Sequence, residues 1–159
     1  MNDDAILNLP SYLLVVVIIT TLLFTVLIQG VLIFKEQSQL KEMERAIEHI
    51  ISSAEYLTTH GKQGSRIAKT IAIPSCINFV SFGLPPTQII KKMGFENKSS
   101  FPSNIYVICY TDGRIEFEYV DFSFASDHPL DSYLLSEGSH KLFIEIIELQ
   151  GNTYVRFSI

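Results

Sequence analysis

The sequence predicts an α+β protein, in which a long N-terminal helix precedes an antiparallel, β-sandwich-like domain. Three observations support this fold class. Residues 5–34 form an unbroken run of 30 uncharged and mostly apolar residues. From Leu40 onward the apolar positions recur at helical spacing, and after Gly64 they alternate as in strands that bury one face. The expected organisation is a helical region over 1–60 and a β-rich globular domain over 61–159.

The first part of the helix is long enough to cross a membrane. As a helix, residues 12–34 would rise about 34 Å, against a hydrocarbon core of about 30 Å. A cleaved signal peptide, the alternative, requires a basic start, a shorter apolar stretch and a small-residue cleavage site. Here Asp3 and Asp4 precede the run and Lys35-Glu36 follows it. We therefore predict an uncleaved membrane or filament-core span. Its principal apolar residues are Tyr12, Leu14, Val17, Ile18, Leu22, Phe24, Leu27, Ile28, Val31 and Phe34.

The second part of the helix, residues 35–59, is amphipathic. Its apolar positions are spaced alternately by three and four residues, which is the spacing of a heptad seam. Neither Pro nor Gly interrupts residues 31–60, and Gly61 supplies a stop. We predict one helix from about Ser11 to Thr59, with Pro10 in its first turn and Gly30 as the weakest point. The seam consists of Leu40, Met43, Ile47, Ile50, Ala54 and Leu57.

The remaining chain reads as strands joined by turns. Two hairpins are expected, turned at Asp112-Gly113 and at Gly151-Asn152. In the first hairpin Phe117 is predicted to face the core, and in the second Phe157. The predicted strands cover 67–73, 77–82, 104–110, 114–122, 140–150 and 153–159, with a short helix over 87–93 and loops over 96–103 and 123–131.

Composition and motifs argue against nucleic-acid binding and against catalysis. The chain carries 12 Lys and Arg against 17 Asp and Glu, and its longest basic run is Lys91-Lys92. Its four histidines are not at metal-ligand spacing, and no phosphate loop or hydrolase motif occurs. Asp127, His128 and Asp131 form the nearest approach to an acid–base set, but a solvated loop explains them better. We predict a non-enzymatic protein with no cofactor, no metal site and no small-molecule substrate.

Three smaller features leave alternatives open. Cys76 and Cys109 both fall on predicted strands, where they would either pair as a disulfide or remain buried thiols. Asn97 begins an Asn-Lys-Ser glycosylation acceptor, which would require an external domain. Lys35 and the basic residues after it, read by the positive-inside rule, favour a cytoplasmic domain instead. The hydroxyls of Thr20, Thr21 and Thr25 would bond either to their own helix or to an adjacent one.

An apolar N-terminal helix that continues into an amphipathic half and then a compact β domain resembles archaeal type IV pilin-like proteins. This superfamily includes pilins, archaellins and archaellar stator components. Segments 71–77 after the helix and 134–146 near the C-terminus are similar to strands of those β-sandwiches. The resemblance implies that the protein assembles with copies of itself or with related proteins through the apolar half of the helix. It also implies that the seam packs on the β domain, which lies outside the cell.

The start of the chain departs from that pattern. Archaeal prepilins carry a basic leader with a processing site, whereas residues 1–5 contain no Lys, Arg or Gly. Either the leader is absent from this sequence, or the protein is not processed and stays in the membrane. The leading expectation is therefore a structural subunit of a pilus-like cell-surface filament. The alternative is a membrane-anchored accessory, stator or surface-binding module.

Overall fold

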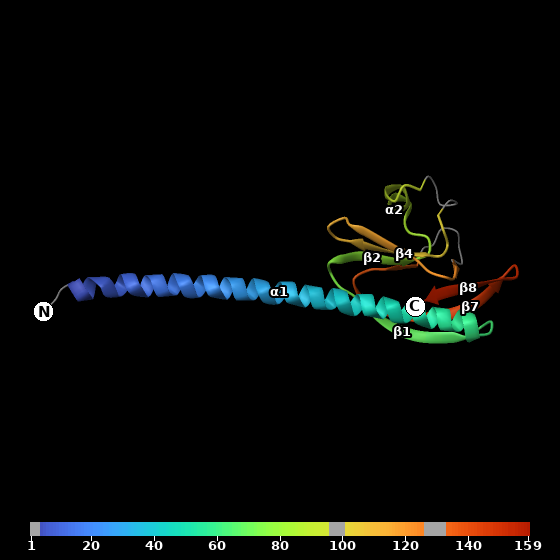
Figure 1. The fold of residues 1–159 in the computed structure, drawn as a ribbon, viewed down its shortest axis with the longest axis horizontal. Coiled ribbons are helices and arrows are strands. Elements are labelled where there is room, and N and C mark those ends of the chain that lie inside the picture. The colour runs from blue at the N-terminus through green and yellow to red at the C-terminus, as the bar shows by residue number, and fades with distance from the viewer. Residues whose placement is uncertain (1–3, 96–100, 126–132) are drawn as a thin grey trace. The chain divides into compact units, whose positions relative to one another are not determined.

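The computed structural model describes residues 4–95, 101–125 and 133–159, and side chains from Tyr12 onward. In these described residues, one long helix, α1 (Asp4–His60), precedes eight strands and one short helix (Figure 1). The chain divides into two compact units, Met1–Gln39 and Leu40–Ile159. The second unit includes the last part of α1, which the sequence grouped with the rest of the helix. The predicted α+β architecture, a long apolar helix followed by largely antiparallel sheets, is confirmed.

Helix α1 begins earlier than the sequence predicts. It starts at Asp4 rather than Ser11, so Pro10 lies within the helix and not in its first turn. The residues before Pro10 include Ala5, Ile6 and Leu7, which favour helix, and one proline removes only one main-chain hydrogen bond. The helix continues through Gly30 and ends at His60, where the amide of Gly61 donates to the carbonyl of Leu57.

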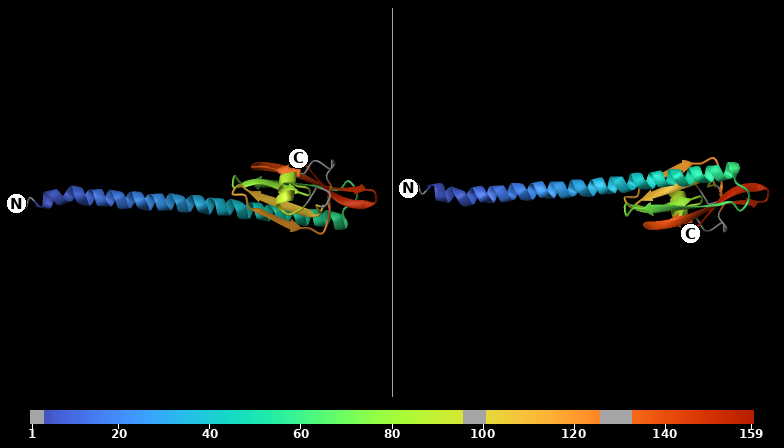
Figure 2. Two further views of the ribbon diagram at one scale, coloured as in Figure 1. Left: turned by 90° about the horizontal axis from the view of Figure 1, so that it is seen from above. Right: turned by 90° about the horizontal axis from the view of Figure 1, so that it is seen from below.

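Two four-stranded sheets make up most of the second unit (Figures 1 and 2). The first has the order β1-β7-β8-β5 and the second the order β4-β3-β2-β6. All pairs are antiparallel except β5 with β8, which is parallel. The strands are β1 (Arg66–Ile73), β2 (Ile77–Phe82), β3 (Ile105–Tyr110), β4 (Ile115–Tyr119), β5 (Phe124–Ala125), β6 (Tyr133–Leu135), β7 (Gly138–Leu149) and β8 (Asn152–Ser158), and the short helix is α2 (Thr87–Lys92).

The two hairpins follow the turn chemistry of the sequence. Gly113 takes a φ of 88°, and the Arg114 amide donates to the Asp112 carboxylate across the β3–β4 turn. The β7–β8 turn is Gln150-Gly151, not Gly151-Asn152, because Leu149 pairs directly with Asn152. Both turn residues have positive φ, 54° and 81°, as a type I′ hairpin requires.

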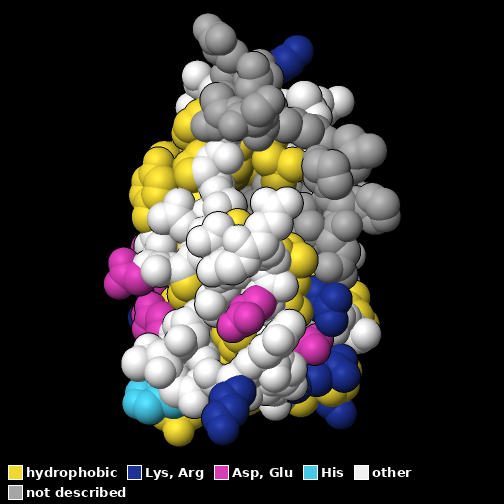
Figure 3. Space-filling model, turned by 90° about the vertical axis from the view of Figure 1, so that its right-hand side faces the viewer, with side chains coloured by type: hydrophobic (Ala, Val, Ile, Leu, Met, Phe, Trp, Pro, Cys, Tyr) yellow, Lys and Arg dark blue, Asp and Glu magenta, His cyan; other side chains and the backbone are white. Residues whose placement is uncertain are grey.

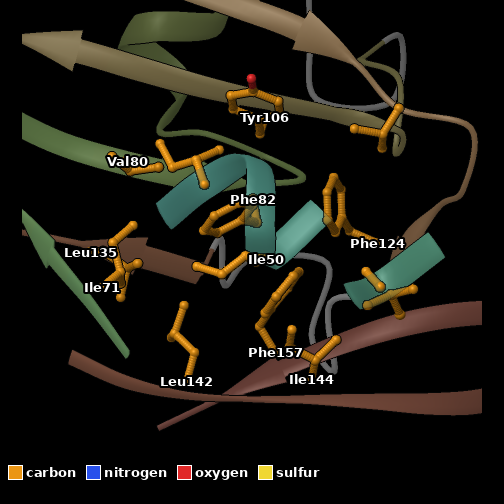
Figure 4. Close-up of a cluster of buried hydrophobic side chains, with 14 of the residues drawn as sticks. Ile50, Ile71, Val80, Phe82, Tyr106, Phe124, Leu135, Leu142, Ile144 and Phe157 are labelled. Atoms are coloured by element: carbon orange, nitrogen blue, oxygen red, sulfur yellow. The ribbon is translucent and has the colours of Figure 1, made fainter. Parts of the chain in front are cut away.

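The principal core lies between the two sheets and the last turns of α1. Figure 4 shows Ile50 of α1 among strand residues that come from both sheets, such as Phe82 and Phe157. Met43, Ile47 and Ile50 are at most 2% exposed. The seam predicted from heptad spacing is therefore the surface by which the helix packs on its own strands.

A second, smaller core covers the opposite face of β3. Val107 and Cys109 of β3 pack there with Ile89 and Ile90 of α2 and with Phe101. Tyr106, Ile108 and Tyr110 of the same strand join the principal core. Every residue of β3, an inner strand of its sheet, is consequently buried.

The prediction that Phe117 of β4 faces the core is wrong. Phe117 is 46% exposed, whereas Phe157 of β8 is 7% exposed and belongs to the principal core as predicted. Phe117 pairs with Val107, so it lies on the α2 side of the sheet. The strand is at the sheet edge, where α2 does not cover it fully. Glu116 and Glu118 occupy the face toward α1, where two tyrosines of β3 engage them.

Candidate functional site

The apolar segment of α1 is the most distinctive surface in the described chain. From Tyr12 to Phe34 its large apolar side chains are between 43% and 74% exposed, on every side of the helix. The helix contains one stretch long and apolar enough to cross a membrane, by the criteria of length and composition. A surface of this kind is stable only when another apolar phase or another protein covers it.

Polar groups within the apolar segment are satisfied by the helix itself. The hydroxyls of Thr20, Thr21 and Thr25 each donate to a carbonyl one turn earlier, at 2.8–2.9 Å. Of the two alternatives for these threonines, the structure shows the bond to their own helix. The hydroxyl donors of these threonines are therefore satisfied within the helix.

The seam residues divide α1 into two regions with different surroundings. Met43, Ile47, Ile50, Ala54 and Leu57 are at most 5% exposed and belong to the principal core. Leu40 is half-buried and packs against the same core. The apolar side chains from Tyr12 to Phe34 remain exposed, whereas the seam side chains after Leu40 are covered by the chain's own strands.

Two tyrosine–carboxylate pairs join β3 to β4 on the side that faces α1. The Tyr110 hydroxyl donates to Glu116 at 2.7 Å, and the Tyr106 hydroxyl donates to Glu118 in the same way. Burial, and then the bond to Glu118, raises the pKa of Tyr106 above its usual range. Burial and the bond to Glu116 raise the pKa of Tyr110 likewise. Both phenols are held neutral as donors, which fixes the orientation of the β4 carboxylates.

A surface groove runs beside α1, along β4 and the segment after it. It consists of two adjoining hollows of about 290 Å³ and 540 Å³, both lined by Val120 and Asp121. Glu48 and Glu55 of α1 form one wall, and Glu118 lies on the other. Among the described residues, neither lining contains Lys, Arg or His. We call this surface the acidic groove; the remaining lining residues are Ile51, Ser52, Tyr106 and Tyr119 in the smaller hollow, and Thr58, Asn104, Phe122, Ser123 and Thr153 in the larger.

The two cysteines lie on opposite faces of the β4-β3-β2-β6 sheet. Cys76 packs against the principal core just before β2, and Cys109 belongs to the second core. Both are thiols in the structure. Their positions on different faces account for the absence of a bond between them, because a disulfide requires neighbouring Cβ atoms.

Within residues 4–95, 101–125 and 133–159, no group of three His, Cys, Asp or Glu side chains is arranged to hold a metal ion. Asn97 and the Asp127, His128 and Asp131 set lie outside the described residues. The acidic groove was not predicted, because its walls come from α1 and β4, which are some 60 residues apart in sequence. No local pattern records such a juxtaposition.

No protein-family model, curated protein or solved structure matches the chain.

Proposed function

We propose that the protein is a pilin-like structural subunit that assembles into a cell-surface filament through residues 12–34 of α1. The observation that carries this proposal is the division of one helix into two surfaces. Its apolar first part is exposed on all sides, and its seam is buried in the chain's own core. A helix that served only to complete the β unit would not need the first part.

The packing of the β unit also supports a non-enzymatic role. The β unit, which we propose as a β-sandwich-like external domain, packs tightly around the seam. The two hollows of the acidic groove are open to the surface, and the phenol of Tyr106 in the smaller one is held as a neutral donor to Glu118. Assembly by the apolar segment would be driven by burial of side chains such as Leu22 and Phe24, each worth about 1.5–3 kcal/mol when fully covered.

A membrane-anchored binding module is the second candidate. The acidic groove favours it, because a groove in the β unit is a surface on which a partner could be bound. In that case the apolar segment would stay in the lipid and would make no contact with other copies. The two candidates therefore differ in what covers residues 12–34.

Electron microscopy after detergent removal tests the proposal. The full chain is expected to form filaments, and Val17→Asp is expected to abolish them, because a charge at a helix centre costs about 2.5–3.5 kcal/mol on translocon scales. Val17→Leu is the matched control and should assemble normally. A wild-type chain that returns to vesicles as a monomer, without filaments, would support the anchored module.

The external location is tested separately by cysteine labelling. Ser139 is exposed at the start of β7, so Ser139→Cys should react with an impermeant maleimide added to intact cells. The unsubstituted chain is the control, since Cys109 is buried and Cys76 half-buried. Labelling that appears only after lysis would place the β unit inside.

A further inference from the structure

The outer face of the β1-β7-β8 sheet is cationic and centred on one aromatic ring. Arg66 of β1 stacks on the Phe143 ring at 3.9 Å, and the Lys141 ammonium lies 5.4 Å from the same ring. Glu145 accepts a hydrogen bond from Arg156 at 2.8 Å, which neutralises that pair. Arg66 and Lys141 remain as the excess positive charge. We call this surface the Phe143 face.

The acidic groove carries the opposite charge on another side of the same unit. Glu48 and Glu55 lie on α1, and Asp121 follows β4. In the described residues, none of these three carboxylates forms an ion pair. Figure 3 shows one face of the molecule, on which Lys and Arg side chains gather mainly at the lower right, and Asp and Glu side chains lie at the left edge, in the centre and at the lower right.

The two surfaces also match in spacing. The charged groups of Arg66 and Lys141 lie 3.9 Å and 5.4 Å from the same Phe143 ring, so they are at most about 9 Å apart. Glu48 and Glu55 are seven residues apart on α1, or about 10 Å. Long Arg and Lys side chains adjust readily over a difference of this size, so both cations of one surface can meet carboxylates of the other at once.

We infer that the Phe143 face of one copy docks on the acidic groove of the next, as a charge-paired contact between β units. This inference rests on the proposed function, because assembly through the apolar helices would bring the β units of neighbouring copies close together. The Phe143 ring and Tyr119 supply aromatic surface, and Arg66 and Lys141 supply the charges. We take a neighbouring copy as the partner because every copy carries both the cationic Phe143 face and the acidic groove.

The contact is heterologous, because it joins two different surfaces of the same chain. Contacts of this kind repeat from copy to copy and produce open chains unless the rotation closes a ring. It would therefore act in addition to the apolar helix, and would set the register between successive subunits.

Charge reversal of the full-length protein tests the contact. Glu55→Lys and Lys141→Glu should each raise the concentration needed for assembly at least about tenfold, since like charges then face each other. The double variant with both changes should restore assembly to within about twofold of wild type. Glu42→Lys and Lys91→Glu are matched controls on exposed positions outside both surfaces, and should assemble normally.

Zero-length cross-linking identifies the contact directly. Assemblies mixed from isotopically light and heavy chains, treated with a carbodiimide, should yield a mixed peptide that joins Lys141 to Glu48 or Glu55. Near-ultraviolet circular dichroism of each variant establishes that it is folded before assembly is scored.

The outcomes separate this inference from the proposed function. If Glu55→Lys and Lys141→Glu assemble like their controls while Val17→Asp does not, the groove contact is wrong and the filament stands. If the wild-type chain yields no mixed peptide in filaments or in vesicles, the contact is also wrong. Loss in both single variants with recovery in the double variant supports it.

Discussion

Two phenylalanines, each in the second strand of a hairpin, have opposite surroundings. Phe157 stacks on Phe82 at 4.7 Å and lies near Phe124, whereas Phe117 contacts Tyr119 at the sheet edge and is 46% exposed. Phe157→Ala should lower the free energy of unfolding by about 3–5 kcal/mol, because it leaves a cavity in the principal core. Phe117→Ala is the matched control and should change it by about 0.5 kcal/mol or less.

Urea unfolding of the full chain in detergent, followed by near-ultraviolet circular dichroism, measures both changes. Equal losses for the two variants would mean that the Phe117 side chain is covered in solution.

The tyrosine–carboxylate pairs predict a loss of stability at alkaline pH. Burial raises the pKa of Tyr106 and Tyr110 above their ordinary value of 10.0. The folded state thus favours the neutral phenols, and this contribution is complete below about pH 10. It is lost as the pH rises through and above that value. Urea midpoints between pH 8 and 11 should show the decline.

The double variant Tyr106→Phe/Tyr110→Phe should have a shallower decline, since its two phenols no longer titrate. It should not be flat, because burial also raises the pKa of Tyr133. An unchanged slope in the double variant would show that other groups cause the alkaline loss.

At the scale of the element, the seam of α1 joins the helix to the sheets. Ile50 is 1% exposed between strands of both sheets, so Ile50→Asp would bury an unpaired charge and should cost several kcal/mol. His49→Asp places the same charge on the exposed side of the same turn and should be nearly neutral. Thermal melts of the two variants in detergent make the comparison. Similar melting temperatures would show that the seam is not packed in solution.

Elements with a strong periodic pattern could be predicted from the sequence. The seam keeps its heptad spacing over five helical turns, and the two hairpins have alternating strands with glycine turns, so their existence followed from local pattern. The two shortest strands, β5 (Phe124–Ala125) and β6 (Tyr133–Leu135), were missed. They are two and three residues long, which is too short for an alternating pattern to be recognised. They are identified as strands only by their pairing with β8 and β2, which are distant in sequence.

The face of β4 could not be predicted for a related reason. Its sequence alternates Glu with apolar residues, which by pattern places Phe117 in the core. The structure instead uses Tyr106 and Tyr110 of β3 to engage the two glutamates, and leaves Phe117 at the edge. Local alternation identifies the two faces of a strand but not which layer covers each face. The acidic groove could not be predicted either, because it also depends on how distant elements pack.

At the scale of the whole molecule, the compact unit begins within the helix. Leu40–Ile159 form one unit, which includes the seam. A fragment that starts at Lys35 should therefore fold cooperatively as a monomer in water. A fragment that starts at Gly61 lacks the five most buried seam side chains and should show little near-ultraviolet circular dichroism and bind a hydrophobic dye.

Size-exclusion chromatography and dye binding distinguish the two fragments. A helical oligomer of the longer fragment, together with a well-folded shorter one, would assign the seam to contacts between copies.

The seam has a mechanical consequence. Because α1 is helical throughout Leu40–His60, a pull applied at Leu40 acts on the β unit along the axis of this part of the helix. The side chains from Met43 to Leu57 would then be loaded in shear, several turns together, instead of being peeled away one turn at a time. An anchored domain of this build should resist tension along the helix far better than tension applied at its C-terminal strand, where β8 can unzip from β7 one pair after another.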